Sequence, residues 1–350
     1  MPRMSSFLAV AAFSGVLCIV AGCGNTSATG SNQTNESIDI QGAGSTFVAP
    51  LMLKWADEYQ KQHPGVSVEY DVVGSGKGQQ EFVAGAVDFG ASDSALKDEQ
   101  IAAVAKGVQL VPVAAGCIVL AYNVEGIPDG LKLARDVYPD IYLGKIVNWD
   151  DPRIAKVNPG VALPKMPIVM AVRVDLSGTT FAFTNHLAAI SEEWRSRFGA
   201  ATGVQWPGHT VGGPGNDGVA GLVKRLPGAI GYVEYGTAKR AGLQMARLEN
   251  KEGQFIRPTG GTGLSTLLNA ELPANLRSFF PDPAGKESYP IVTYTWLLLY
   301  KQYAPGKVKA IKDFVSWALT DGQHFNESLG FIRVPPKVEA AGLEAVQAIQ

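Results

Sequence analysis

The stretch Ser177–Thr179, which contains Ser, Gly and Thr and follows Arg173, has residue types that could bind an oxyanion. The apolar run Ile168–Val172 before it is typical of a buried strand, and residues 180–187 after it are typical of a helix. The first N–H groups of a helix lack intrahelical acceptors, and the helix dipole places positive potential there. With two hydroxyls and a guanidinium, such a helix start can hold a compact anion. The same residues also fit a plain helix cap.

Thr46 and Phe47 lie at a second junction of this kind. A short strand signal, Ile38–Ile40, precedes them, and apolar residues recur at helical spacing over residues 50–62. Pro50 suits a first helical turn, where its missing N–H is no loss. We therefore expect free donors at Thr46 and Phe47, with a plain cap at Thr46 as the alternative.

Ser75 lies in a glycine-rich turn, Gly74–Gly78, between a predicted strand, Val66–Val73, and a helix from about Gln79. The turn is not a nucleotide-binding P-loop, because that motif needs a further upstream Gly and a Ser or Thr after the Lys. Its glycines still allow backbone amides to approach an anion closely.

Asp93 follows a short strand signal at residues 87–92 and precedes a polar helix predicted over residues 97–105, which it could simply cap. A carboxylate suits an anion site only if the anion carries a proton, as hydrogen phosphate does. Sulfate lacks that proton at neutral pH, and an unpaired buried polar group can reject an analogue by roughly 10⁴–10⁵. Asp93 is therefore a candidate selectivity residue.

The elements that position these residues alternate between strands and helices. Further strands are predicted at 108–113, 117–122, 229–233 and 291–300, and further helices in part of 136–149, from the glycine-rich turn 212–219 to about 225, at 308–319 and at 338–349. Asp150 and Asp151 precede Pro152, which favours a helix cap over acid–base or metal chemistry. Residues 253–288 show no clear pattern. The alternation predicts α/β architecture with mostly parallel sheets, in which ligands bind beyond the carboxyl ends of strands.

The length, composition and net charge of the chain limit the classes of protein to which it can belong. The 350 residues suffice for two domains, and 46% hydrophobic with 18% charged residues is typical of a globular protein. A formal charge of −2 without a basic run argues against a nucleic-acid partner.

The amino terminus predicts an extracytoplasmic protein. Arg3 precedes an apolar run typical of a signal peptide over residues 1–22, and small residues before Cys23 resemble a lipoprotein cleavage box. An ordinary secretory signal is the alternative. Residues 23–37 then read as a flexible tether. Cys117 is expected in the core, with no disulfide and no metal-type cysteine pair.

Taken together, the motifs resemble the PstS family, the phosphate-binding proteins of bacterial phosphate ABC importers. The resemblance covers essentially the whole mature chain and is carried by residues 42–47, 74–76, 88–93, 142–146, 149–151, 177–179 and 228–235. It implies a two-lobed periplasmic-binding-protein fold, type II-like, with a hinge. Residues 38–121 plus 290–350 would form the first lobe and 122–289 the second, with crossovers near Tyr122 and Tyr289.

The resemblance also implies roles for individual residues. Asp93 would accept the proton of phosphate, Arg173 would pair with the anion, and Asp175 would orient Arg173. The other implied phosphate ligands are Thr46, Phe47, Ser75, Ser177, Gly178 and Thr179, with Gly74 and Gly76 in support. The implied partners are inorganic phosphate, a membrane-embedded ABC permease and a lipid anchor at Cys23, with no cofactor, no metal and a monomeric state.

Two departures from the family and three other functions are relevant. Leu176 stands where the family has a small residue, and Lys77 adds a cation beside the glycine turn. A phosphomonoester hydrolase with a Ser or Thr nucleophile is one alternative, although the four histidines are scattered without a triad or metal pattern. Others are a binder of a different tetrahedral oxyanion, if Asp93 lies outside the site, and a sugar or amino-acid receptor, for which no aromatic platform is evident. We expect a binding protein and not an enzyme.

Overall fold

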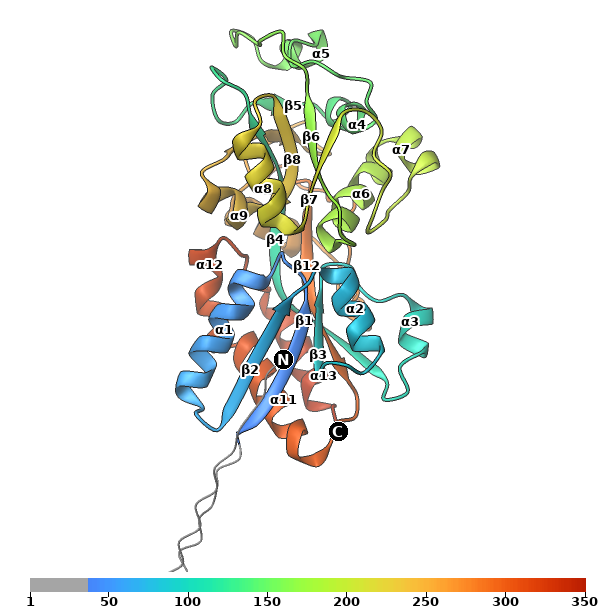
Figure 1. The fold of residues 1–350 in the computed structure, drawn as a ribbon, viewed down its shortest axis with the longest axis vertical. Helices are drawn as coiled ribbons and strands as arrows, with labels where there is room; N and C mark the ends of the chain where they lie inside the picture. Colours follow the sequence, from blue (N-terminus) through green and yellow to red (C-terminus); the bar gives the residue numbers. More distant parts are fainter. Residues whose placement is uncertain (1–36) are drawn as a thin grey trace, which may run out of the picture. The chain divides into compact units, whose positions relative to one another are not determined.

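Strands and helices alternate along residues 37–350, the part of the chain that the computed structural model describes (Figure 1). One sheet contains nine strands in the order β2-β1-β3-β12-β4-β8-β6-β7, with β9 paired to β4, and a small sheet has the order β11-β10-β5. The strands of the large sheet are, in chain order, β1 (Ile38–Gly44), β2 (Val66–Val72), β3 (Phe89–Ser92), β4 (Val108–Asn123), β6 (Val169–Arg173), β7 (Thr210–Gly213), β8 (Ala229–Glu234), β9 (Gln244–Met245) and β12 (Val292–Tyr300). The small sheet contains β5 (Lys132–Leu133), β10 (Arg247–Glu249) and β11 (Phe255–Ile256).

The large sheet is parallel at its two flanks and antiparallel in the middle. β1 runs parallel to β2 and β3, and β6 runs parallel to β7 and β8. β12 is antiparallel to β3 and β4, and β4 is antiparallel to β8. The expectation of mostly parallel sheets thus describes the flanks alone, because β12 comes from late in the chain and inserts between β3 and β4.

β4 is a single strand of 16 residues instead of the two strands predicted. Residues Ala114–Gly116, which lay between the two predicted strands, are buried and pair with β12. Residues Val108–Cys117 pair with β12, and Ile118–Asn123 pair with β8. β4 therefore carries the chain from one group of strands to the other. The lobe boundaries given above remain a prediction.

Helices flank this sheet. α1 packs on β2, α2 on β1 and β3, and α8 on β6 and β8. The helices are α1 (Ala49–Gln62), α2 (Ser75–Val83), α3 (Asp98–Ala102), α4 (Val137–Tyr142), α5 (Pro152–Val157), α6 (Gly178–Ile190), α7 (Glu192–Arg197), α8 (Gly215–Arg225), α9 (Tyr235–Ala241), α10 (Gly260–Leu268), α11 (Pro305–Leu319), α12 (Asn326–Leu329) and α13 (Pro336–Gln347), with a 3₁₀ turn at Asp321–Phe325.

Helix starts agree with the sequence where a cap or proline marks them. α1 has Pro50 in its first turn, and the Asp151 carboxylate accepts from the Arg153 amide at the start of α5, as predicted for a cap. α2 begins at Ser75, earlier than predicted, because Gly74 adopts a φ of 88° and lets the glycine turn itself coil into the helix. α10 lies in the region without pattern, where Thr259 forms a capping box with Thr262.

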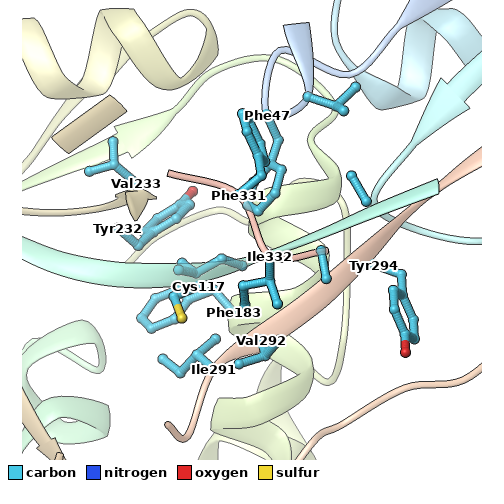
Figure 2. Close-up of a cluster of buried hydrophobic side chains, with 14 of the residues drawn as sticks. Phe47, Cys117, Phe183, Tyr232, Val233, Ile291, Val292, Tyr294, Phe331 and Ile332 are labelled. Atoms are coloured by element: carbon cyan, nitrogen blue, oxygen red, sulfur yellow. The ribbon is translucent and has the colours of Figure 1, made fainter. Parts of the chain in front are cut away.

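A cluster of buried side chains packs around the paired strands β4 and β12 (Figure 2). The Phe47 ring packs edge-on against Phe331 at 6.1 Å between ring centroids. Cys117 is 1% exposed and forms no disulfide, which confirms its predicted place in the core. The cluster anchors the loop after β1 and both central strands in one core.

The predictions for residues 1–36, namely the signal peptide, the lipidated Cys23 and nearly all of the tether, lie outside the described residues. Within residues 37–350, no helix has the length and apolar character needed to cross a bilayer.

Candidate functional site

The predicted anion-binding residues lie at the carboxyl ends of strands in the two parallel groups of the large sheet. Thr46 follows β1, Ser75 follows β2 and Asp93 follows β3, and these three strands are parallel. Ser177 follows β6 in the other parallel group. The two groups run in opposite directions along β4, so their carboxyl ends face each other, and the helix starts of α1, α2, α6 and α8 lie between them (Figure 1).

Asp93 is the buried centre of this region, with 1% of its surface exposed. The Ser45 Oγ lies 2.8 and 2.7 Å from its two carboxylate oxygens, and Thr295 Oγ1 lies 2.6 Å from Oδ1. Burial raises the pKa of Asp93 to about 6, while the hydroxyl donors and the Arg173 charge oppose that rise. Asp93 is thus a buried proton acceptor held by hydroxyl groups.

The starts of α2 and α6 contact each other next to Asp93. The Gly76 amide donates to the Leu176 carbonyl at 2.9 Å. A Cβ added at Gly178 would lie 2.6 Å from Ser75 Oγ and 2.7 Å from Asp93 Cβ. The glycine is needed because the start of α6 directly touches the start of α2.

Arg173 and Asp175 form an ion pair at the end of β6. Arg173 Nε donates to Asp175 Oδ1 at 2.8 Å, and Nη2 donates to the other carboxylate oxygen. Arg173 Nη1 also lies 3.3 Å from Thr179 Oγ1. Burial favours the neutral Asp175, but Arg173 outweighs it and holds the pKa of Asp175 below its ordinary value. This ion pair holds the guanidinium in a fixed orientation and places a negative charge beside it.

Ser177 and the next two residues form the start of α6. The Ser177 Oγ accepts from the Thr180 amide at 3.1 Å, so the capping interpretation is confirmed. A hydroxyl that accepts there keeps its own proton to donate elsewhere. The amides of Gly178 and Thr179 stand in the first turn, where no intrahelical acceptor exists. Capping and anion binding are therefore compatible at Ser177.

The loop at Thr46 and Phe47 has a different geometry from the one expected. The Phe47 amide donates to the Ser45 Oγ at 3.0 Å, so this predicted free donor has an internal acceptor. Its ring is fully buried and fixes the loop to the core. Thr46 Oγ1 instead faces Asn216, whose amide nitrogen donates to it at 3.1 Å.

Asn216, Ser45 and Thr295, which were not predicted, form hydrogen bonds with predicted site residues. Asn216 Nδ2 also lies 3.2 Å from Thr179 Oγ1, and its Oδ1 accepts from the Glu234 amide at 3.0 Å. Asn216 is the second residue of α8 and lies in the glycine-rich turn noted in the sequence, a signal that could have identified it. The sequence feature that could have identified Thr295 is its hydroxyl inside the apolar strand β12.

The two departures from the family, Lys77 and Leu176, both have solvent-exposed side chains. Lys77 is largely exposed and faces Glu81 at 3.6 Å. The Leu176 side chain is 48% exposed, while its carbonyl accepts from the Gly76 amide. Within residues 37–350, Asp93, Arg173 and Thr179 form no hydrogen bond with either of these side chains.

The described residues contain no group of His, Cys, Asp and Glu that could hold a metal ion. The site instead combines buried hydroxyls, amides at helix starts, one carboxylate and one paired guanidinium. Such a set can bind a tetrahedral oxyanion through neutral dipoles and accept one proton from it.

Comparison with known proteins places the chain among binding proteins. A family model described as a PBP superfamily domain matches residues 25–322. The chain is 39% identical to a phosphate-binding protein PstS of Methanocaldococcus jannaschii, over 95% of this chain and 92% of the relative. It is also 39% identical to a phosphate-binding protein PstS of Pasteurella multocida, over 87% of this chain and 89% of the relative.

A solved structure with the same fold is that of PfluDING, a high-affinity periplasmic phosphate-binding protein bound with phosphate. It superposes with a TM-score of 0.73 at 20% identity, over 87% of this chain and 92% of the other. Together with the match to the family model, this likeness shows the two-lobed periplasmic-binding-protein fold.

Proposed function

Because the chain belongs to the PstS family of phosphate-binding proteins within the PBP superfamily, we propose that it binds inorganic phosphate and delivers it to an ABC permease for import. The observation that carries the proposal is the buried Asp93 carboxylate among hydroxyl groups and helix starts. A carboxylate there repels an unprotonated dianion and accepts a hydrogen bond from a protonated one. This chemistry selects phosphate over sulfate.

The ligands in this proposal come from both groups of strands. Thr46, Ser75 and Asp93 contribute from one side, and Arg173 with the Ser177–Thr179 stretch contributes from the other. The Phe47 amide is a ligand only if it leaves the Ser45 hydroxyl. Dipoles carry most of the binding, because Asp175 offsets the Arg173 charge. Release then requires opening of the site and not the neutralisation of many charges.

We assign the two lobes as residues 38–121 plus 290–350 and residues 122–289. With these bounds, the contacts of Ser75 with Gly178 and of Thr46 with Asn216 join the lobes. They belong to a closed state, and a hinge motion at β4 and near Ile291 separates them. Closure excludes water and strengthens each hydrogen bond to the ligand.

The permease meets the rim of the closed site in this proposal. Exposed apolar side chains, Leu53, Val72, Val174 and Leu176, lie on segments of both lobes at this rim. Leu53 and Val72 also line a groove of about 530 Å³ that reaches Asp175 and Asp217. A permease that binds a surface spanning both lobes can distinguish the closed protein from the open one, because the shape of this surface changes when the lobes separate.

An extracytoplasmic location follows from the same proposal. Lipidation of Cys23 anchors the protein to the membrane, and residues 24–37 tether the binding domain. The protein acts as a monomer, with no nucleic-acid partner and no cofactor. Replacement of Cys23 by Ala releases the protein from the membrane fraction in this account, whereas an unchanged distribution contradicts the anchor.

Phosphomonoester hydrolysis is the weaker candidate, because each histidine is engaged away from the hydroxyls. His186 lies between the Tyr138 hydroxyl and the Pro281 carbonyl, and His63 bonds the Tyr59 carbonyl. His209 lines a separate cavity, and His324 packs on Phe325. Ser177 and Thr179 thus lack a histidine base among the described residues.

Calorimetric titration of the purified protein with phosphate and with p-nitrophenyl phosphate, plus an assay for released nitrophenol, tests the proposal. We expect one-to-one phosphate binding without hydrolysis. Turnover of the ester supports the hydrolase, and failure to bind phosphate contradicts the receptor function.

A further inference from the structure

Two threonines interrupt the otherwise apolar strand β12. Thr295 is fully buried and Thr293 is 4% exposed. A buried hydroxyl is costly unless it forms a hydrogen bond, so each needs a partner. Thr295 Oγ1 lies 2.6 Å from Asp93 Oδ1, whereas Thr293 Oγ1 lies 3.3 Å from the Asp93 backbone carbonyl. The two hydroxyls therefore contact the same residue at chemically different atoms.

Strand register explains this placement. β12 pairs antiparallel with β3, and the pair at the end of β3 is Ser92 with Trp296. The next position along the ladder sets Asp93 beside Thr295. Thr293 is two residues away on β12 and points to the same face. On the other side of β12, the register of its pairing with β4 shifts between Thr295 and Trp296, next to the residue that contacts Asp93.

The hydrogen-bond directions at Asp93 are fixed by its neighbours. The Phe47 amide donates to Ser45 Oγ, so the Ser45 proton is directed to the carboxylate. Thr295 donates to Oδ1, because an ionised carboxylate can only accept. The Ser75 hydroxyl is more distant, at 3.3 Å from Oδ2.

Few charged or titratable groups face Asp93. The Arg173 guanidinium acts on it from β6, and the Tyr70 phenol of β2 lies close enough to respond to its charge. Tyr70 donates its own proton to the Ser45 carbonyl at 2.9 Å. The carboxylate thus depends chiefly on Ser45 and Thr295 for direct hydrogen bonds.

We infer that Thr295 is a positioning residue that keeps the Asp93 carboxylate ionised and oriented, and thereby sets the preference of the site for an oxyanion that carries a proton. The inference rests on the proposed phosphate-binding function and assigns part of its selectivity to a residue on β12. Without the Thr295 hydroxyl, Asp93 takes up a proton more readily. Its own O–H can then donate to an unprotonated anion such as sulfate, and the basis for rejecting sulfate is weakened.

The test compares three variants of the full protein. Thr295→Val removes the hydroxyl and keeps the shape, Thr295→Ser restores a hydroxyl, and Thr293→Val removes the neighbouring hydroxyl that contacts only backbone carbonyls. Phosphate and sulfate dissociation constants are measured by calorimetry from pH 6 to 8.5, after circular dichroism has verified folding. Ser45→Ala gives a second route to the same carboxylate if Thr295→Val does not fold.

We expect Thr295→Val to lower the sulfate-to-phosphate ratio of dissociation constants by about tenfold to hundredfold at pH 7, the range for one hydrogen bond to a charged group. The effect should shrink toward pH 8.5, where Asp93 ionises again, and Thr295→Ser should recover most of the ratio. An unchanged ratio, or an equal and pH-independent loss of both anions, overturns the inference. If the unmodified protein fails to bind phosphate, the proposed function itself fails and the inference falls with it.

Discussion

The side-chain amide of Asn216, at the start of α8, lies 3.1 Å from the Thr46 hydroxyl, at the end of β1. The same amide nitrogen lies 3.2 Å from Thr179 Oγ1, so one residue contacts two predicted ligands. Since the amide donates to both hydroxyl oxygens, the hydroxyl protons remain free to point at an anion. Asn216 thereby links the two sides of the site.

Replacement of Asn216 by Ala should weaken phosphate binding by about tenfold to hundredfold, because each hydroxyl loses one of the two donors that orient it. Calorimetry measures the change. Asp217→Asn is the matched control, since Asp217 is the exposed neighbour in the same turn and should bind as the unmodified protein does. Equal affinities for Asn216→Ala and the control contradict this role.

Gly178→Ala should prevent closure. The added Cβ would lie 2.6 Å from Ser75 Oγ and 2.7 Å from Asp93 Cβ, closer than real contacts allow. We expect phosphate affinity to fall by about a hundredfold or more, on the scale of an overpacked site. Gly260→Ala provides the control, because Gly260 is also the first residue of a capped helix but has no neighbour within 4 Å of an added Cβ. Tight binding by Gly178→Ala would show that the site does not close in this way.

His186 should make stability depend on pH. It is fully buried between Tyr138 and Pro281, and burial lowers its pKa from 6.5 to about 4. Above pH 6.5 both folded and unfolded His186 are neutral. As the pH falls from 6.5 to 4 the unfolded state gains a proton first, so the folded state loses about 3 kcal/mol.

Urea unfolding of His186→Asn from pH 7 to 4 measures this contribution. The variant should be less stable at pH 7 but lose less stability than the unmodified protein on acidification. His63→Asn, at an exposed position, serves as the control and should follow the unmodified protein. A parallel pH dependence for His186→Asn contradicts the assignment.

Leu53→Asp should impair phosphate uptake by cells without weakening phosphate binding. Leu53 is 49% exposed at the rim of the site, where a charge disfavours an apolar contact with the permease. Leu268→Asp changes an equally apolar side chain, 64% exposed on α10, and should leave uptake intact. Uptake that is equal in the two variants removes Leu53 from the permease surface.

The sequence predicted the positions of candidate ligands in the fold where local patterns determine structure. Ser75, Asp93 and Ser177 were placed at strand ends because each follows an apolar run and precedes a helix, and the structure has them there. Proline in α1 and the Asp151 cap of α5 were predictable for the same reason. These features depend on residues within one or two turns.

Contacts between distant segments could not be predicted in this way. Thr295 reaches Asp93 only because β12 inserts beside β3, across 202 residues of sequence. Asn216 reaches Thr46 across 170 residues. The continuity of β4 through Ala114–Gly116, which the prediction left out of both strands, likewise comes with their pairing to β12. The places of these residues in the fold depend on pairing between distant strands and not on local propensity.

The central claim is that the buried Asp93 carboxylate selects an oxyanion that carries a proton. The direct measurement is calorimetric titration of the unmodified protein and of Asp93→Asn with phosphate and with sulfate at pH 7.5. We predict tight phosphate binding with sulfate rejected by at least about a thousandfold in the unmodified protein, and sulfate binding gained in Asp93→Asn, because an amide can donate to sulfate. Equal binding of phosphate and sulfate by the unmodified protein would contradict the account.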